Sequence, residues 1–375
     1  MKKNALQEIR KLGQGIWLDY WHRGMLEDGE FQRLLTEDGI TGVTTNASLF
    51  QQALAEGEVY GAAMDGLAAL DLPAEEIYRR LVVEDAQAAA DRLEPVHARS
   101  DGRDGYMCLA VNPQLTHDSD ATTADALDLW TRVKRPNLMI KVPATDAGLL
   151  AIRHLTAEGV NTNATLIFDP DRYEQAAEAY VSGLQARLQR SESIRGITGA
   201  ASVLVGRIDL RIDAMIREGI GQNPDRTELA GKLEGSVGIA VARQSLLLHK
   251  RIFDEEPFRR PASAGATPQR LVWASTGPKS ARYDEHKYVD ALVGADTIVA
   301  MHPATLDSYR ERGKPARRLE ETLDQARYCL DQMPAADIDL SAVGRSLENE
   351  GIRAFAAARQ VTLQQIEARR ESAAR

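Results

Sequence analysis

The stretch LMIKVPATDAGLLAIRHLTAEGVNTNATLIF, residues 138–168, decides the fold. Residues 138–142 and 163–168 are short apolar runs, and residues 147–158 between them carry apolar side chains at helical spacing. A strand, a helix and a strand in this order predict two parallel strands joined by a helical crossover. The stretch therefore favours a protein of the α/β class.

Apolar runs of the same kind recur along the whole chain. We expect eight strands, at residues 15–18, 42–44, 107–111, 138–142, 163–168, 202–205, 271–274 and 297–301. Eight strands that alternate with helices predict a closed (β/α)8 TIM barrel. An open doubly wound sheet is the alternative, but no glycine-rich dinucleotide fingerprint follows the first run.

The domain organisation follows from this pattern. We expect one barrel domain that spans residues 1–375, because no composition shift marks a second domain. The helical, alanine-rich residues 50–105 and the helical patterns in residues 308–375 predict additional helices around the barrel. The proline-containing residues 255–268 are expected to form a surface loop before the seventh strand.

Composition narrows the classes of function. The chain has 43% hydrophobic and 27% charged residues, as globular proteins do, and a net charge of −9. A negative surface argues against general binding to nucleic acid or membranes. The two cysteines, Cys108 and Cys329, lie in apolar patterns and are expected to be buried thiols in a cytoplasmic protein.

Lys141 is the only charged residue in the apolar run 138–144. Removing an ammonium ion from water is unfavourable, so a lysine at this place needs a reason. It could extend to solvent or pair with a carboxylate. Alternatively, a neutral amine in an apolar pocket can attack a ketone and form a Schiff base.

Polar side chains end most of the other predicted strands, and a barrel gathers catalytic groups from several strands at the carboxyl ends. These residues are Asp19, Thr44, Asn46, Asn163, Thr165, Ser202, Arg207, Ser275 and Lys279. Each has a structural alternative. Asp19 and Asn46 could cap the following helices, the hydroxyls and amides could satisfy buried backbone groups, and Arg207 could pair with Asp209 or Asp213.

Together these groups suit the chemistry of a phosphosugar. An amine makes an imine, a carboxylate moves protons, and amides and hydroxyls hold sugar hydroxyls. Arg207, Ser275 and Lys279 can bind a phosphate through charge-assisted hydrogen bonds. A pyridoxal phosphate enzyme is disfavoured, because no partner for the ring nitrogen is recognisable. A metal aldolase is disfavoured because the seven histidines are scattered.

Six segments of the chain resemble the transaldolases, in particular the longer bacterial form of the enzyme. The segments are residues 39–46, 137–145, 159–168, 201–209, 273–277 and 303–307. The resemblance implies a class I aldolase barrel that needs no metal or organic cofactor and works as a monomer or homodimer. It also implies transfer of a dihydroxyacetone unit between sugar phosphates of the pentose phosphate pathway.

The resemblance also implies roles for the strand-end residues. Lys141 forms the imine, Asp19 takes a proton when the carbon–carbon bond breaks, and Thr165 positions a catalytic water. Thr44, Asn46, Asn163 and Ser202 hold the dihydroxyacetone unit. Arg207 and Ser275 bind the phosphate, assisted by Lys279.

One position departs from the family pattern. Ala110 stands where the resemblance leads us to expect a glutamate that moves protons through a water. Three interpretations stay open: a slow transaldolase, a specialised paralogue that performs another aldol-type reaction on a sugar phosphate in secondary metabolism, and a phosphosugar-binding protein with impaired catalysis.

Overall fold

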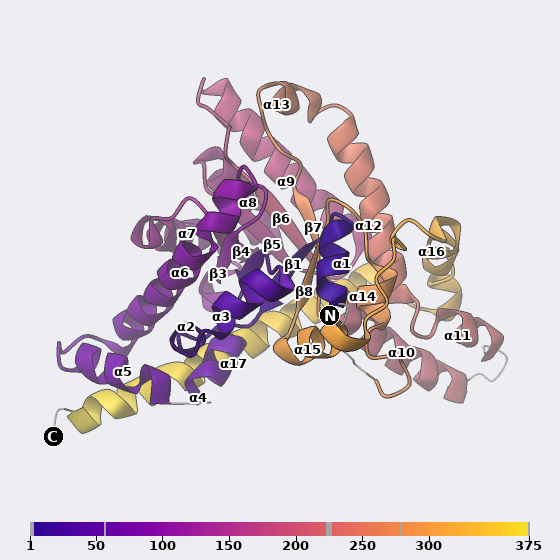
Figure 1. Cartoon of the computed structure of the whole chain (residues 1–375). Helices are drawn as coiled ribbons and strands as arrows, with labels where there is room; N and C mark the ends of the chain where they lie inside the picture. The colour runs from indigo at the N-terminus through magenta and orange to yellow at the C-terminus, as the bar shows by residue number, and fades with distance from the viewer. Residues whose placement is uncertain (1–3, 56–57, 223–226, 278–279, 374–375) are drawn as a thin grey trace.

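The eight predicted strands form one closed parallel barrel, in the order β1 to β8 (Figure 1). The computed structural model describes residues 4–55, 58–222, 227–277 and 280–373. The strands are β1 (Gly15–Asp19), β2 (Gly42–Thr44), β3 (Tyr106–Ala110), β4 (Leu138–Pro143), β5 (Thr162–Ile167), β6 (Gly199–Leu204), β7 (Arg270–Ala274) and β8 (Ile298–Met301). The prediction of a (β/α)8 barrel is confirmed.

Helices follow the strands and surround the barrel (Figure 1). In the first half of the chain they are α1 (Ala5–Lys11), α2 (Gly24–Glu27), α3 (Glu30–Arg33), α4 (Ala47–Ala55), α5 (Gly61–Ala68), α6 (Ala74–Arg99), α7 (Ser119–Val133), α8 (Asp146–Ala157) and α9 (Pro170–Gln189). In the second half they are α10 (Val205–Gln222), α11 (Thr227–Leu233), α12 (Val237–Asp254), α13 (Arg259–Ser263), α14 (Lys287–Ala291), α15 (Pro303–Arg312), α16 (Leu323–Asp331) and α17 (Leu340–Ala373). Within the described residues there are also a π-helical turn, η1 (Leu34–Asp38), and three 3-10 turns, η2 (Glu58–Tyr60), η3 (Pro113–Leu115) and η5 (Pro334–Ala336).

Two local predictions differ from the structure. The segment predicted as a loop at residues 255–268 contains α13, because Phe258 is buried and packs edge-on against Phe253 with ring centroids 4.8 Å apart. Strand β6 begins at Gly199 rather than Ser202. The small residues 199–201 gave no strand signal, but Gly199 pairs with β5, and Ala200 and Ala201 pair with both β5 and β7.

Alternate side chains of each strand point into the barrel. A buried inner cluster contains Trp17, Tyr106, Cys108 and Met139, while Ile140 and Val142 belong to the cluster beneath the helices. Gly42 makes room for the largest of these inward side chains, since a Cβ at this position would lie 2.4 Å from the Trp17 indole nitrogen. Lys141 therefore projects into the barrel, two residues above Met139.

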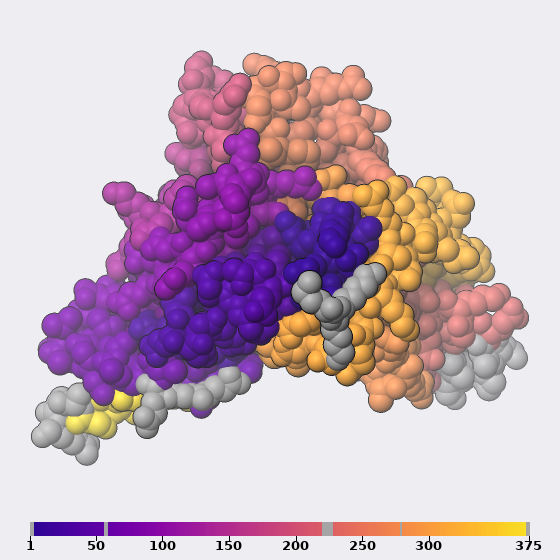
Figure 2. All heavy atoms as spheres, in the orientation of Figure 1, coloured from indigo at the N-terminus to yellow at the C-terminus, as the bar shows by residue number. Residues whose placement is uncertain are grey.

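Helix α17 extends across the barrel and contacts α4, α5, α6, α10 and β5. Figure 1 shows it as a long yellow helix, and in Figure 2 its visible end lies beneath the purple part of the chain. Gly351 permits its close approach to β5, because a Cβ there would lie 2.8 Å from Cδ2 of Leu166. A helix that is distant in the sequence therefore covers the carboxyl end of a barrel strand.

A buried carboxyl group, Glu348, lies on the packed face of α17 and is 7% exposed. Burial raises its pKa to about 7. Asp146 and Asp169 raise the pKa further, while Arg172 and Arg345 lower it. A carboxyl group with a raised pKa favours the folded state only while it is protonated. Its contribution is therefore complete below about pH 4.5 and is lost as the pH rises towards 7.

We expect Glu348→Gln to make the stability of the protein less sensitive to pH. The variant and the parent chain should unfold with similar free energies at pH 4.5, and at pH 8 the variant should be more stable by roughly 3 kcal/mol. Chemical unfolding at several pH values measures the difference. Glu350→Gln is the control on the same helix, because Arg211 lowers the pKa of Glu350 and its effect should be constant above pH 5. If Glu348→Gln raised the unfolding free energy by the same amount at pH 4.5 and at pH 8, the raised pKa of Glu348 would be contradicted.

Candidate functional site

Lys141 occupies the centre of the barrel mouth. Its side chain projects from β4, the residue is 7% exposed, and its ammonium nitrogen donates a hydrogen bond to Thr44 Oγ1 at 2.8 Å. No carboxylate of the described residues lies within ion-pair distance of it. Lys141 is therefore neither exposed to solvent nor part of an ion pair, which were the two structural alternatives.

Eight of the candidate residues surround one cavity at the carboxyl ends of the strands, which has about 300 Å³ of space for water and which we call the Arg207 cavity. They are Asp19, Thr44, Asn46, Lys141, Thr165, Ser202, Arg207 and Ser275. Lys279 lies outside the described residues. The residues that the sequence placed at successive strand ends are therefore brought together around one space.

Asn163 lies beneath this cavity rather than on its wall. It is fully buried, its Oδ1 accepts a hydrogen bond from Ser202 Oγ at 2.9 Å, and its Nδ2 lies 3.5 Å from Cys108 Sγ. Burial raises the pKa of the Cys108 thiol to about 12, so the thiol is neutral at physiological pH. Asn163 thus fixes the orientation of the Ser202 hydroxyl.

Asn46 has a structural role as well as a place in the site. Its Oδ1 accepts hydrogen bonds from the backbone N–H groups of Ser48 at 3.0 Å and Leu49 at 3.2 Å, at the start of α4. These are the bonds of a helix N-cap. Because the cap uses only the oxygen, the Nδ2 group is available to donate to a ligand.

Thr165 is positioned by an irregularity in β5. The register of β5 against β6 shifts between Ala164 and Ile167, and Leu166 has a φ of +60°. A leucine in the left-handed region is strained, and such strain persists only where the surrounding packing fixes it. Here the Leu166 side chain is buried against α17 at Gly351. The bulge therefore sets the direction of Thr165 at the mouth.

Besides Lys141, two charged groups in the Arg207 cavity, Asp19 and Arg207, have no partner of opposite charge among the described residues. The side chain of Asp19 makes no hydrogen bond with another described residue. Helix α2, which follows it, begins without a side-chain cap, so Asp19 is not a helix cap. The alternative ion pairs of Arg207 are also absent. Asp209 instead accepts from Lys287 at 2.9 Å, and Asp213 accepts from the Tyr283 hydroxyl at 2.6 Å. Arg207 is half-buried in the first turn of α10, where its guanidinium is available to an anion.

The backbone at Ser275 is also unusual. It follows β7 with a φ of +58°, a conformation in which residues other than glycine are uncommon. The next residue, Thr276, donates a hydrogen bond from its hydroxyl to the carbonyl of Ala300 at 2.7 Å. This bond ties the turn to β8, so that Ser275 is held at the edge of the cavity.

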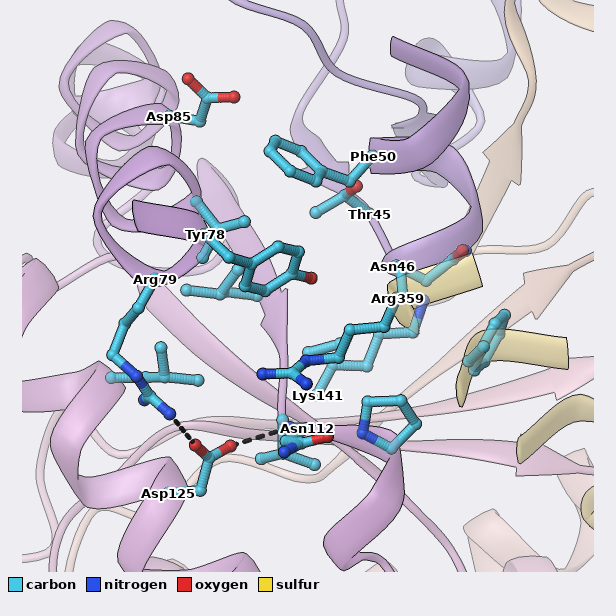
Figure 3. A pocket seen from close by; sticks show the side chains of 18 of the residues that line it. Thr45, Asn46, Phe50, Tyr78, Arg79, Asp85, Asn112, Asp125, Lys141 and Arg359 are labelled. Atoms are coloured by element: carbon cyan, nitrogen blue, oxygen red, sulfur yellow. Dashed lines mark hydrogen bonds and ion pairs between the residues drawn. The ribbon is translucent and has the colours of Figure 1, made fainter. Parts of the chain in front are cut away.

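A second, smaller cavity, with about 60 Å³ of space for water, meets the first at Lys141. We call it the Ala110 cavity. Both cavities are lined by Asn46, Lys141, Thr165 and Phe355. Figure 3 shows the Ala110 cavity with Tyr78, Phe50 and Arg359 around it and Lys141 at its base.

The two residues that α17 contributes, Phe355 and Arg359, were missed by the sequence analysis. Their positions depend on where a distant helix packs, which local patterns do not report. One signal was present, because Phe355 is the only aromatic residue in α17, among alanines and charged side chains. A lone aromatic residue in such a helix indicates which face of the helix packs against the rest of the protein.

Ala110 lies directly beside the amine in the sheet. It is the register partner of Lys141 on the neighbouring strand, and both side chains point into the barrel. Adjacent strands are about 4.8 Å apart. A longer side chain at position 110 would therefore extend to the vicinity of the Lys141 amine.

The chain is similar in sequence to known proteins of one family. The model of the transaldolase/fructose-6-phosphate aldolase family matches residues 16–366. The chain belongs to this family. It is 36% identical to the transaldolase of Thiobacillus denitrificans over 97% of this chain and 99% of that protein. It is 37% identical to the transaldolase of Mycobacterium tuberculosis over 98% of both chains.

Across the residues that the structure describes, no three His, Cys, Asp or Glu side chains are grouped in a way that would hold a metal ion. None of the helices in the same part of the chain combines the length and the apolar character that a membrane crossing requires.

The two roles of Asn46 can be separated by substitution. Asn46→Asp keeps an oxygen for the helix cap but removes the amide donor, so we expect the stability to be retained and the KM for a sugar phosphate to rise. Asn46→Ala should also lose about 1 kcal/mol of unfolding free energy. Thermal unfolding and steady-state kinetics of both variants test this. An Asn46→Asp variant with an unchanged KM would show that the residue only caps α4.

Proposed function

We propose that this protein is a transaldolase. It transfers a dihydroxyacetone unit from sedoheptulose 7-phosphate to glyceraldehyde 3-phosphate, giving erythrose 4-phosphate and fructose 6-phosphate, in the pentose phosphate pathway. The observation that carries the proposal is the buried Lys141 amine in one cavity with Asp19 and Arg207, neither of which has a partner of opposite charge among the described residues.

Lys141 supplies the nucleophile. Its nitrogen attacks the donor ketone, and loss of water gives an imine that draws electrons from the neighbouring carbon–carbon bond. Asp19 takes the proton of the hydroxyl on the far carbon, the bond breaks, and the aldose phosphate leaves. The remaining enamine attacks the acceptor aldehyde, whose oxygen takes the proton back. A water held by Thr165 then hydrolyses the new imine and frees Lys141.

The other residues hold the substrate. The Asn46 amide, Thr44 and Ser202 bind the hydroxyls of the dihydroxyacetone unit, and Asn163, expected from the sequence to bind them too, orients the Ser202 hydroxyl from beneath the cavity. Arg207 and Ser275 bind the phosphate, with Lys279 from the same loop, through charge-assisted hydrogen bonds. The mechanism needs no metal or organic cofactor. We place the enzyme in the cytoplasm, which the two free, buried cysteines support.

The comparisons favour this function over the two alternatives. The similarity covers nearly the full length of relatives that are named transaldolase. A specialised paralogue or a non-catalytic binding protein would need evidence of its own. We expect Ala110 to lower the rate of turnover, because we propose that it replaces a glutamate that moves protons at the imine.

The imine can be trapped. Borohydride added with fructose 6-phosphate should reduce it to a stable amine and add one dihydroxyacetone unit to the protein, at Lys141, as read by intact mass and peptide mapping. Lys141→Met should give no adduct and no turnover, because the thioether is not nucleophilic toward a ketone. Equal labelling of the two proteins would rule out Lys141 as the Schiff-base residue. Phosphosugars that raise the melting temperature without any adduct would instead favour the binding protein.

Restoring a carboxylate at position 110 should raise the rate. General acid–base catalysis is worth 10²- to 10⁴-fold, so we expect Ala110→Glu to raise kcat for transfer to erythrose 4-phosphate by about 10-fold or more. Ala110→Gln is the matched control, of equal size but unable to transfer a proton, and should give no gain. If Ala110→Glu is as slow as Ala110→Gln, the site has been adapted to another aldol reaction.

A further inference from the structure

His302 is a side chain of the Arg207 cavity that the proposed mechanism does not use. It follows β8 directly and lines the cavity together with Asp19, Lys141 and Arg207. None of the other histidines, all of which lie in the described part of the chain, lines either cavity. A neutral imidazole offers one hydrogen-bond donor and one acceptor, which are the groups that a sugar hydroxyl can bind.

The pleat of β8 points His302 towards the inside of the barrel. On this strand Ala300 belongs to the inner cluster, whereas Met301 belongs to the cluster beneath the helices. Because successive side chains of a strand alternate between the two faces, the residue after Met301 faces inward again. This agrees with the place of His302 on the wall of the cavity.

Asp19 occupies the neighbouring position on β1. Leu18 of β1 pairs with Met301 of β8, and Asp19 and His302 are the next residues along the two strands. Adjacent strands are about 4.8 Å apart. The imidazole therefore lies beside the carboxylate that takes the proton in the proposed mechanism.

Packing supports the His302 ring on one side and leaves its nitrogens available. The buried ring of Tyr20 lies against it, with the two centroids 5.8 Å apart. His302 stands at the N-cap position of α15, but its side chain makes no cap hydrogen bond. Among the described residues, no hydrogen bond or ion pair involves its imidazole. The side chain thus has no structural partner besides Tyr20.

The order of the strands places His302 between the two ends of the aldose phosphate. In the proposed mechanism Asp19 takes the proton of the hydroxyl on carbon 4 of fructose 6-phosphate, and Arg207 and Ser275 bind the phosphate on carbon 6. Strand β8 lies between β1, which carries Asp19, and β7, which Ser275 follows (Figure 1). Carbon 5 and its hydroxyl therefore pass the end of β8. Of the two residues that line the cavity there, Ala300 and His302, only His302 has a polar side chain.

We propose that His302 binds the hydroxyl on the carbon between the cleaved bond and the phosphate-bearing carbon, and that it selects for sugar phosphates that carry this hydroxyl. The inference rests on the proposed transaldolase function, which fixes the two ends of the substrate. His302 forms a hydrogen bond and takes no part in the covalent steps. It is a specificity-determining residue of the site.

The test removes the two hydrogen-bond partners separately. The donor 5-deoxyfructose 6-phosphate, which lacks the hydroxyl on carbon 5, is compared with fructose 6-phosphate, and erythrose 4-phosphate is the acceptor. Both donors give sedoheptulose 7-phosphate, which is quantified by mass spectrometry, and kcat/KM is determined for each donor. Any difference between the donors in free solution cancels when the ratio of the two kcat/KM values is compared between variant and parent.

We expect His302→Ala to lower kcat/KM for fructose 6-phosphate by about 10-fold and that for the deoxy donor by less than about 2-fold, because only the first donor loses a hydrogen bond. His302→Gln should recover part of the preference, since its amide can also bind a hydroxyl. His22→Ala is the matched control and should change neither value. His22 packs against the same Tyr20 ring, with centroids 5.5 Å apart, and lines neither cavity.

Three outcomes would overturn the role of His302. They are an unchanged kcat/KM for fructose 6-phosphate in His302→Ala, an equal loss for both donors, and the same loss in His22→Ala. Because His302 is exposed, His302→Ala should fold, and its melting temperature checks this. Borohydride trapping with fructose 6-phosphate separates this failure from failure of the proposed function. A trapped adduct with an unchanged donor preference rejects only the role of His302, whereas the absence of an adduct rejects the Schiff base itself.

Discussion

The closure of the barrel is the constraint on which the rest of this structure depends. Eight parallel strands pair around a ring, so every second side chain of each strand must share one interior. The lower part of that interior is filled by large groups such as Trp17 and Met139, which leave no room for solvent. The last inward position of each strand lies above this plug. Polar groups placed there face one another across a small space, and a buried amine such as Lys141 finds a partner in Thr44 on a strand distant in the sequence.

The same constraint explains how much the sequence could predict. The strands were recognisable because their outward residues are apolar, and the topology then brought their polar ends together without any knowledge of contacts. Strand β6 was recognised only in part, because Gly199 and its neighbours acquire their conformation from pairing rather than from propensity. The strain at Leu166 was also not predictable, since it depends on Gly351, nearly two hundred residues later in the chain. Phe355 and Arg359 were missed for the same reason, because a helix reveals its apolar face but not its partner.

The distribution of ion pairs separates structural from functional charges. Most buried charges of the described residues have partners, as Asp209 has in Lys287 and Arg359 has in Glu75, because a buried charge without compensation is strongly destabilising. The structural alternative for Arg207 was an ion pair with Asp209 or Asp213, and both of these carboxylates have other donors. An arginine that stays half-buried without a carboxylate keeps its charge for an anion that is not part of the chain. This argument is independent of the family, and it supports the phosphate-binding role that we propose for Arg207.

Ala110 lies beside the buried amine of Lys141 in the sheet and also lines the apolar cavity. A glutamate at this position would place a carboxylate beside Lys141 and would also project toward the apolar cavity, whose other charged groups are already paired. Ala110 offers only a methyl group there, so no carboxylate lies in register with the Lys141 amine. Loss of proton transfer alone would give a slower enzyme with the same substrates. We therefore expect Ala110 to slow the proton transfers at the Lys141 imine without changing which substrates bind.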